Sequence, residues 1–323
     1  MLSKRLVALI AGASLALGAA SAATAQSYPQ RPVKIIAAVV AGSPVDLVAR
    51  AVADKLSISL KQSFVVENRP GVGGNLGAEV AAKAAADGYT LLVALDTTFT
   101  VNPSLYKKLP FDPDADFRPI SIMALSSAML VVHPSVPVNS VAELVAYARK
   151  EPMAYAHGGN GSPGHLTMEY FRLQAKFPAT PVPYRGNTPL VNDLVAGQIK
   201  LGFVGTGGVI QHVLAGRLKA FAISTSKRSP IAPDVPTMAE VGYPGFKVET
   251  YYVMLAPAGI PDSIAATLEH EVRRALQAPD LQERFRPMNT EIAATTGAEA
   301  KVRIKADAEL WSKVVKAADM RVD

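Results

Sequence analysis

Residues 33–46 read VKIIAAVVAGSPVD, and this stretch spans a complete strand-to-helix transition. The first eight residues, Val33 to Val40, form an apolar run that predicts a strand buried on both faces. Gly42 and Ser43 then supply a turn, and Pro44 suits the first position of a helix. The stretch therefore predicts a β-strand, a tight loop and an α-helix in direct succession.

The same alternation continues along the chain and sets the fold class. The helix expected after Pro44 carries an apolar residue at every fourth position: Val48, Val52, Leu56 and Leu60. Further apolar runs alternate with helical patterns, among them YTLLVAL, AMLVVHP, IKLGFV and KAFAIST. This order predicts an α/β fold of doubly wound type, with mostly parallel strands covered by helices on both faces.

Chain length and two strand-like segments predict two α/β domains. A chain of 323 residues exceeds the size at which one hydrophobic core usually stops growing. The apolar segment 128–134 and the long segment 247–259 are candidate crossovers, which makes residues 27–128 plus 253–323 the first domain and 129–252 the second. Two such sheets joined by a double hinge leave a ligand cleft between the ends of their strands.

The N-terminus has the pattern of an export signal. Lys4 and Arg5 precede an apolar run that ends at small residues in an A-x-A pattern, which predicts a cleavable signal peptide over residues 1–25. No later segment of the sequence has the length expected of a membrane span. With no cysteine for disulfides or lipid attachment, the expected location is the periplasm, without an anchor.

Charge excludes one large class of partner. The formal net charge is +6, and the lysines and arginines are scattered rather than clustered or interleaved with aromatic residues. This distribution predicts no nucleic-acid binding, and only a weak general preference for small anions.

Glycine-rich turns at expected helix starts are the candidate ligand site. Such turns let the backbone approach a ligand, and the free N–H groups at a helix start attract negative charge. Each loop taken alone could instead be an ordinary structural turn. For Asp46 the alternative to ligand binding is a helix N-cap, and for Arg185 it is a structural salt bridge or an exposed side chain. The candidates are Gly42, Ser43, Pro44, Asp46, Asn160, Gly161, Ser162, His165, Arg185, Thr206 and Gly207.

No motif for catalysis, metal binding or a cofactor is found. The sequence NGSPG carries Asn160 where a G-x-S-x-G nucleophile elbow needs glycine. Gly159, Gly161 and Gly164 match G-x-G-x-x-G, but the acidic residue that a dinucleotide site needs about 20 positions later is missing. The five histidines are dispersed, and His157 and His165, which could approach each other, lack nearby carboxylates, so no metal site is expected. A secreted α/β hydrolase or lyase stays the less favoured alternative to a binding protein.

Several long motifs carry a family resemblance. In order they are VVENRPGVGGNLGAE, GGNGSPGHL, VPYRGNTPLVNDLVAGQI and PDVPTMAEVGYPGF. This series resembles the Bug proteins, the extracytoplasmic solute receptors of tripartite tricarboxylate transporters. The resemblance covers nearly all of the chain after the expected signal peptide.

The resemblance implies a Venus-flytrap fold and a small carboxylate ligand delivered to a membrane permease. We also expect a monomer without a cofactor. A sensor that presents its ligand to a membrane kinase is the alternative. By position, the family's binding loops fall at Gly42 to Asp46, at Asn160 to His165, and at a further loop of Asp96, Thr97 and Thr98. The chain departs from the family pattern at Ala38, Val40, Ser43 and Val204, so an altered pocket is expected.

Overall fold

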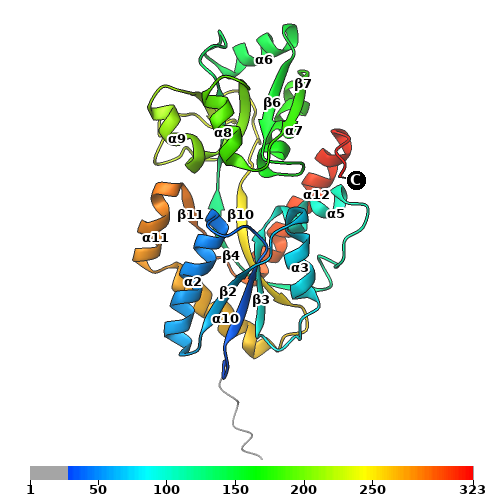
Figure 1. Ribbon diagram of the computed structural model, residues 1–323, viewed down its shortest axis with the longest axis vertical. Helices are drawn as coiled ribbons and strands as arrows, with labels where there is room; N and C mark the ends of the chain where they lie inside the picture. The colour runs from blue at the N-terminus through cyan, green and yellow to red at the C-terminus, as the bar shows by residue number, and fades with distance from the viewer. Residues whose placement is uncertain (1–27, 323) are drawn as a thin grey trace, which may run out of the picture.

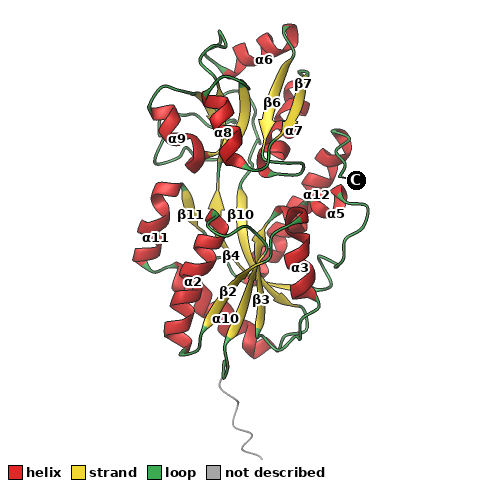
Figure 2. Ribbon diagram, in the orientation of Figure 1, coloured by secondary structure: helices red, strands yellow, loops and turns green. Residues whose placement is uncertain are grey.

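The computed structural model describes residues 28–322, and Figure 1 shows two α/β lobes stacked along the long axis of the molecule. The predicted signal peptide lies outside the described residues. One lobe holds a six-stranded sheet in the order β11-β4-β10-β3-β1-β2, and the other a five-stranded sheet in the order β7-β6-β8-β5-β9. Figure 2 shows helices flanking the strands in both lobes. The predicted α/β class with two sheets is confirmed.

The first lobe is built from both ends of the described chain. Its strands are β1 (Val33–Ala37), β2 (Phe64–Asn68), β3 (Thr90–Leu95), β4 (Phe117–Ser126), β10 (Thr250–Pro257) and β11 (Thr290–Ile292). Its helices are α2 (Pro44–Leu60), η1 (Val72–Gly74), α3 (Asn75–Ala82), α4 (Thr97–Thr100), α5 (Asn102–Leu105), α10 (Asp262–Leu276), α11 (Pro279–Phe285), η2 (Arg286–Met288) and α12 (Gly297–Ala317).

The second lobe is built from the middle of the chain. Its strands are β5 (Ala128–Val132), β6 (Met153–His157), β7 (Ala179–Pro183), β8 (Leu201–Gly205) and β9 (Lys219–Ile223). Its helices are α6 (Val141–Lys150), α7 (Pro163–Ala175), α8 (Asn187–Val195) and α9 (Thr206–Leu214). No helix among residues 28–322 is both long and apolar enough to cross a membrane.

Most strands of each sheet run in one direction, as expected, and the exceptions are β11 and the two strands, β5 and β10, that carry the chain into a new lobe. β1 runs parallel to β2 and β3, and β6 runs parallel to β7 and β8. β5 enters the second lobe against the direction of β8 and β9, and β10 returns to the first lobe against β3 and β4. Each connecting strand takes an interior position in its sheet, so its neighbours on both sides are antiparallel.

The lobes are joined by one very short connection and one long one. Only Ser127 separates β4 of the first sheet from β5 of the second, whereas residues 224–249 lie between β9 and β10. The chain thus changes sheets within a residue of the predicted boundary at 128/129. On the return, residues 250–252 already belong to the first sheet, just before the predicted boundary at 252/253. The division into domains at these positions stays a prediction.

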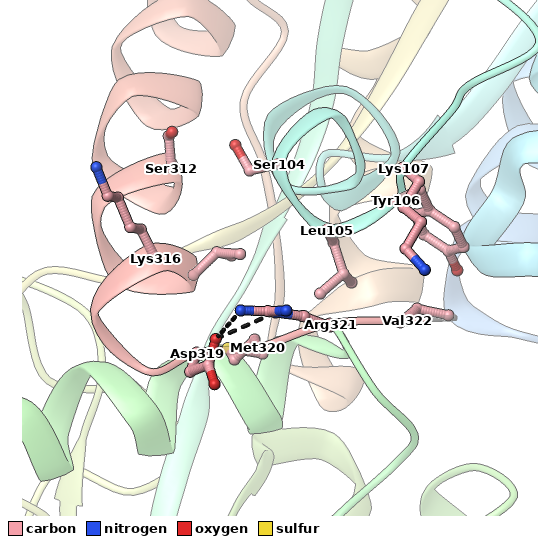
Figure 3. A pocket seen from close by; sticks show the side chains of 11 residues that line it. Ser104, Leu105, Tyr106, Lys107, Ser312, Lys316, Asp319, Met320, Arg321 and Val322 are labelled. Atoms are coloured by element: carbon pink, nitrogen blue, oxygen red, sulfur yellow. Dashed lines mark hydrogen bonds and ion pairs between the residues drawn. The ribbon is translucent and has the colours of Figure 1, made fainter.

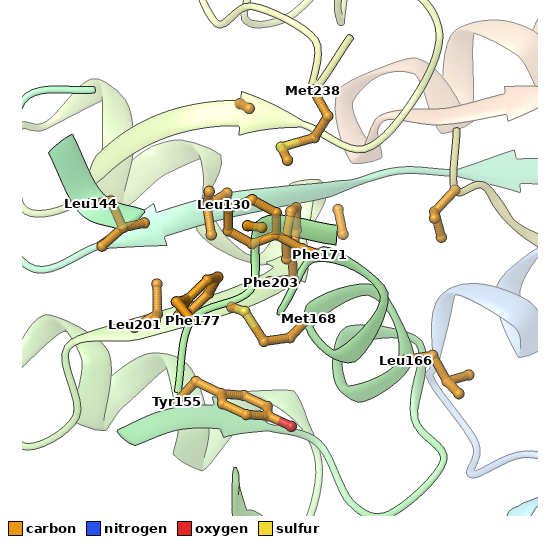
Figure 4. Packing of buried hydrophobic residues seen from close by; sticks show 14 of the residues in the cluster. Leu130, Leu144, Tyr155, Leu166, Met168, Phe171, Phe177, Leu201, Phe203 and Met238 are labelled. Carbon is orange, nitrogen blue, oxygen red and sulfur yellow. The ribbon is translucent and has the colours of Figure 1, made fainter. Parts of the chain in front are cut away.

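The C-terminal helix α12 packs on both lobes. It contacts β4, α4 and α5 of the first lobe and α7 of the second lobe. Trp311 and Val314 of α12 and Leu105 of α5 belong to the hydrophobic cluster built around Phe171 and Phe203, which Figure 4 shows from close by. The lobes therefore share apolar contacts in addition to the two connections.

Candidate ligand-binding site

The first glycine-rich loop is held in place by a buried carboxylate. Asp46 accepts hydrogen bonds from the Gly42 amide at 2.8 Å, from Arg50 Nε at 3.0 Å and from Asn68 Nδ2 at 2.8 Å. Burial disfavours its charge, but the hydrogen bonds from Arg50, Gly42 and Asn68 outweigh that effect and lower the pKa of Asp46. Ser43 caps α2, while its neighbour Gly42 is exposed with φ at 77°. Asp46 thus shapes the loop, and Gly42 and Ser43 form its accessible part.

The loop at Asp96 to Thr98 faces the interior of the first lobe. Asp96 is 4% exposed, and its Oδ1 accepts a hydrogen bond of 3.3 Å from the Tyr251 amide at the start of β10. Burial and the nearby Asp307 carboxylate raise the pKa of Asp96 to about 8. Thr97 and Thr98 are also buried, and Thr98 donates to the Gly73 carbonyl. These three residues support the end of β3 beneath the glycine-rich turn at η1.

Two stacked histidines underlie the loop before α7. The rings of His157 and His165 lie 3.9 Å apart at 13°. His157 Nδ1 lies 2.9 Å from the Gly159 carbonyl oxygen, and His165 Nδ1 accepts a hydrogen bond from the Gly161 amide at 3.2 Å. Burial lowers the pKa of both rings, that of His165 to about 4, so both are neutral near pH 7. Each ring therefore has fixed donor and acceptor positions.

Ser162 starts α7 and has an unused hydroxyl. Its Oγ is enclosed, has no hydrogen-bond partner, and does not cap the helix. The preceding residue, Gly161, lies against the first lobe so closely that a Cβ there would clash with Leu105 Cδ2. A polar atom enclosed at a helix start without a partner is the kind of group that a bound ligand or water satisfies.

Asn160 and His165 open toward the C-terminal segment. Both line a cavity of about 300 Å³ together with Glu169, Arg172 and residues of the C-terminal segment such as Arg321. A neighbouring cavity of about 500 Å³ lies between α5 and the end of α12, where Arg321 pairs with Asp319 (Figure 3). No residue of the Gly42 to Asp46 loop lines either cavity.

The first turn of α9 contacts both lobes. Thr206 is fully buried, and its hydroxyl lies 2.7 Å from Ser127 Oγ in the short connection. Gly207 is exposed, yet a Cβ at this position would come within 2.6 Å of the Met288 carbonyl oxygen in the first lobe. Nothing lies within 4 Å of the Cβ position at Gly208. Thr206 thus ties the turn to the hinge, and Gly207 faces the opposite lobe.

Asn187 is a polar residue at this edge that sequence reasoning missed. Its Oδ1 lies 2.9 Å from the Cβ position of Gly158, and its Nδ2 lies 4.0 Å from that of Gly205. Its side chain therefore sits between the turns that follow β6 and β8. Two positions earlier, Arg185 is exposed and forms no ion pair with any of residues 28–322. The sequence signal was an asparagine at a helix start beside the more conspicuous arginine.

Within residues 28–322, no group of three or more acidic or histidine side chains is placed to hold a metal ion. The polar groups at the facing edges are instead glycine amides, hydroxyls and the carboxamides of Asn160 and Asn187, which suit a small polar organic ligand.

Two α/β lobes joined by two crossing connections, with helix starts at their facing edges, define a periplasmic binding protein. The chain matches the Tripartite tricarboxylate transporter family receptor over residues 48–320, and it belongs to that family. This confirms the resemblance found in the sequence. Members of the family are periplasmic receptors that bind solutes and are not enzymes.

Relatives of known name or structure agree with this assignment. BugT of Bordetella pertussis is 34% identical over 315 residues, which cover 97% of each chain. The structure described as R. palustris Rpa4515 with adipate superposes with a TM-score of 0.81 at 32% identity, covering 91% of this chain and 100% of that one. MatC from Rhodopseudomonas palustris with bound malate gives a TM-score of 0.78 at 30% identity, covering 89% and 100%.

Proposed function

We propose that this receptor captures a small carboxylate between its two lobes and delivers it to a tripartite tricarboxylate-type permease. The observation that carries the proposal is the enclosed and unpartnered Ser162 Oγ at the start of α7. Helix-start amides attract anions, and a serine hydroxyl beside them adds a donor for a carboxylate oxygen. The Ser43 hydroxyl, beside the exposed turn at Gly42, supplies the matching donor on the first lobe.

Hinge closure is the proposed mode of action. Gly161 approaches Leu105 and Gly207 approaches Met288, so the second-lobe turns already meet the first lobe at two points. Ser127 and residues 224–249 allow the lobes to rotate about two connections. A ligand that contacts both lobes favours the closed state, which is the form proposed to dock on the permease.

The chemistry of the relatives' ligands supports a carboxylate. The two structures above contain adipate and malate, and both are dicarboxylates. A carboxylate needs hydrogen-bond donors, and the candidate residues of this chain supply them. Export by a signal peptide over residues 1–25 is part of the same proposal, because the receptor must reach the periplasm.

A thermal-shift screen of carboxylic acids tests ligand capture, since a ligand that binds only the native state stabilises it by RT ln(1 + [L]/Kd). We expect at least one acid to raise Tm in a concentration-dependent way. Ser162→Ala should weaken the binding of that acid by about 5- to 20-fold. The Tm of the ligand-free protein should stay unchanged, because the Ser162 hydroxyl has no hydrogen-bond partner there. No response to any acid, or unchanged affinity in this variant, would contradict the proposed site.

Delivery is tested separately, by uptake into vesicles that contain the permease subunits. Transport of the bound acid that depends on added receptor supports delivery. Binding without receptor-dependent transport would instead favour the sensor alternative.

A further inference from the structure

The leucine that ends α5 lies against a ligand-site loop of the opposite lobe. Leu105 belongs to the first lobe and is 4% exposed. In the second lobe, a Cβ at Gly161 would clash with Leu105 Cδ2, so the backbone of the loop before α7 (residues 158–162, the α7 loop) lies directly on this side chain. Gly161 also has φ at 72°, a conformation that glycine adopts without strain. Leu105 is therefore the first-lobe surface on which the turn before Ser162 rests.

The C-terminal segment, residues 318–322, is bonded to the backbone beside this leucine. The Val322 amide donates to the Leu105 carbonyl oxygen at 3.3 Å, and Val322 forms a parallel bridge with Tyr106. Met320 is 9% exposed, and its amide donates to the Val315 carbonyl oxygen at 3.0 Å, which folds the segment back on the end of α12. The end of the described chain thus contacts Leu105, and Leu105 contacts the α7 loop.

Helix α12 is seated on both lobes before this segment begins. Ala300 and Ile304 of α12 belong to a hydrophobic cluster of the first lobe. Further along, the Trp311 ring is 5% exposed and lies edge-on to Tyr170 of α7, with 6.1 Å between the ring centroids. Figure 1 shows the end of α12 beside α5, which it contacts. The position of the C-terminal segment is therefore set by contacts with both lobes.

Open space next to Leu105 makes its remaining contacts important. The cavities of about 500 Å³ and about 300 Å³ both border Leu105 and the C-terminal segment, and the smaller one also borders Asn160 and His165. Figure 3 shows Leu105 at the larger cavity. Protein interiors rarely contain voids of this size, so packing around Leu105 is incomplete. Its contacts with Gly161 and Val322 therefore contribute much of what fixes its position.

We propose that Leu105 is a positioning residue for the α7 loop, and that the C-terminal segment sets the position of Leu105. With this support, the turn at Gly161 and Ser162 keeps one place relative to the first lobe before a ligand arrives. Such pre-organisation raises affinity, because less conformational freedom is lost on binding. The inference rests on the proposed function, since it gives the C-terminal segment a role in the same site.

Hydrogen exchange of backbone amides, read by mass spectrometry, tests the support without any ligand. The Gly161 amide donates to His165 Nδ1 at 3.2 Å, and the Ser162 amide donates to the Gly159 carbonyl oxygen at 3.0 Å. These bonds protect the two amides while the loop keeps its shape, and local opening exposes them. Exchange in residues 158–166 therefore reports how firmly the loop is held.

Variants at Val322 test the role of the C-terminal segment. Val322→Pro lacks the N–H group that reaches Leu105, and residues 158–166 should exchange about 5-fold faster or more. Val322→Ala keeps this N–H group and should exchange like the unmodified protein. Arg321→Gln is a second control, because the Arg321 side chain bonds to Asp319 within the same segment.

Variants at Leu105 separate positioning from general stability. Leu105→Ala removes the side chain beneath Gly161 and should accelerate exchange in the α7 loop, whereas Leu105→Met refills the space and should restore slow exchange. Leu281→Ala is the matched control, because Leu281 is 3% exposed in a separate cluster of the first lobe. It loses core packing and should leave exchange in the α7 loop unchanged. If Leu105→Ala does not fold, Val322→Pro and its controls decide the question.

Affinity is the second measurement, with adipate and malate as probes in isothermal titration calorimetry. These acids are the ones present in the two related structures. For whichever acid binds, Val322→Pro and Leu105→Ala should weaken binding by about 3- to 10-fold, because the loop must be ordered at the expense of binding free energy. Val322→Ala, Arg321→Gln and Leu105→Met should bind like the unmodified protein.

The outcomes separate this inference from the proposed function. Unchanged exchange of residues 158–166 in Val322→Pro and Leu105→Ala overturns the inference, as does equal acceleration in Leu281→Ala. Faster exchange with unchanged affinity for an acid that binds also overturns it. The carboxylate receptor stands in all of these cases. Failure of every carboxylate to bind overturns the proposed function, while the exchange measurement still decides whether Leu105 supports the α7 loop.

Discussion

The Asn289 side-chain amide donates a 2.5 Å hydrogen bond to Ser127 Oγ, and Ser127 is the single residue between β4 and β5. The Asn289 side-chain oxygen, Oδ1, accepts a 2.6 Å hydrogen bond from the Ser229 hydroxyl in the long connection. Ser127 Oγ also lies 2.7 Å from Thr206 Oγ1. The Asn289 side chain thus joins both interlobe connections to the segment after η2. The two connections are therefore linked by hydrogen bonds in addition to the covalent chain.

Loss of the Asn289 donor should destabilise the hinge. Asn289→Asp keeps the side-chain shape and the acceptor for Ser229 but removes the N–H group that reaches Ser127. We expect the free energy of unfolding in urea to fall by about 1–2 kcal/mol. Because Asn289 has φ at 51°, Asn289→Gly removes both bonds without backbone strain and should lose at least as much. Stability equal to that of the unmodified protein in both variants would show that these bonds do not hold the hinge.

A methyl group at position 207 should obstruct lobe approach. In Gly207→Ala the new Cβ would meet the Met288 carbonyl oxygen at 2.6 Å, so the lobes must move apart there. We expect about 10-fold weaker ligand binding and a larger radius of gyration with ligand by small-angle X-ray scattering. Gly208→Ala is the matched control, because nothing lies within 4 Å of its Cβ. Similar affinities in the two variants would count against closure at this contact.

Asp96 should make the protein less stable as pH rises. Its pKa is raised from 3.8 to about 8 in the folded protein, so between these values the unfolded chain releases a proton that the folded protein retains. The free energy of unfolding therefore decreases from pH 4 to pH 8 through this group. Asp96→Asn keeps the acceptor for the Tyr251 amide and cannot titrate. We would measure the unfolding free energy of both proteins in urea. The difference in favour of Asp96→Asn should be larger at pH 8 than at pH 5. The same pH dependence in both proteins would refute the raised pKa of Asp96.

His165 should have the opposite effect at acid pH. The unfolded imidazole takes up a proton near 6.5, whereas burial and the adjacent His157 lower the folded pKa to about 4. The stabilisation is fully present above pH 6.5 and is lost as pH falls toward 4. His165→Asn offers an oxygen to the Gly161 amide and does not titrate, so its unfolding free energy should decline less over this range. A steeper decline in the variant than in the unmodified protein would be inconsistent with a neutral buried ring.

Local patterns predicted the elements that depend on local chemistry. The i+4 stripe of α2 is buried at Val48, Val52 and Leu56, and Ser43 and Pro44 begin the helix as expected. In each case one residue type fixes a helix start or one face, so the signal lies within a few residues.

Features that depend on distant partners were not accessible from the sequence. The antiparallel direction of β10 follows from its return from the other lobe, and a strand's own residues do not encode its direction. Asp96 looked like an accessible loop carboxylate, but it is covered by β10, 155 positions away along the chain. Asn187 drew no attention because its position between Gly158 and Gly205 appears only once the two strand ends are brought together.

A crystal structure of the protein with the acid that binds best would show where the ligand is held. We predict that its carboxylate contacts the helix-start groups at Gly42 and Ser43 on one lobe and Ser162 on the other, with the lobes closed over it. An acid found instead in the 500 Å³ cavity between α5 and the end of α12, with the helix starts empty, would contradict ligand capture between the lobes.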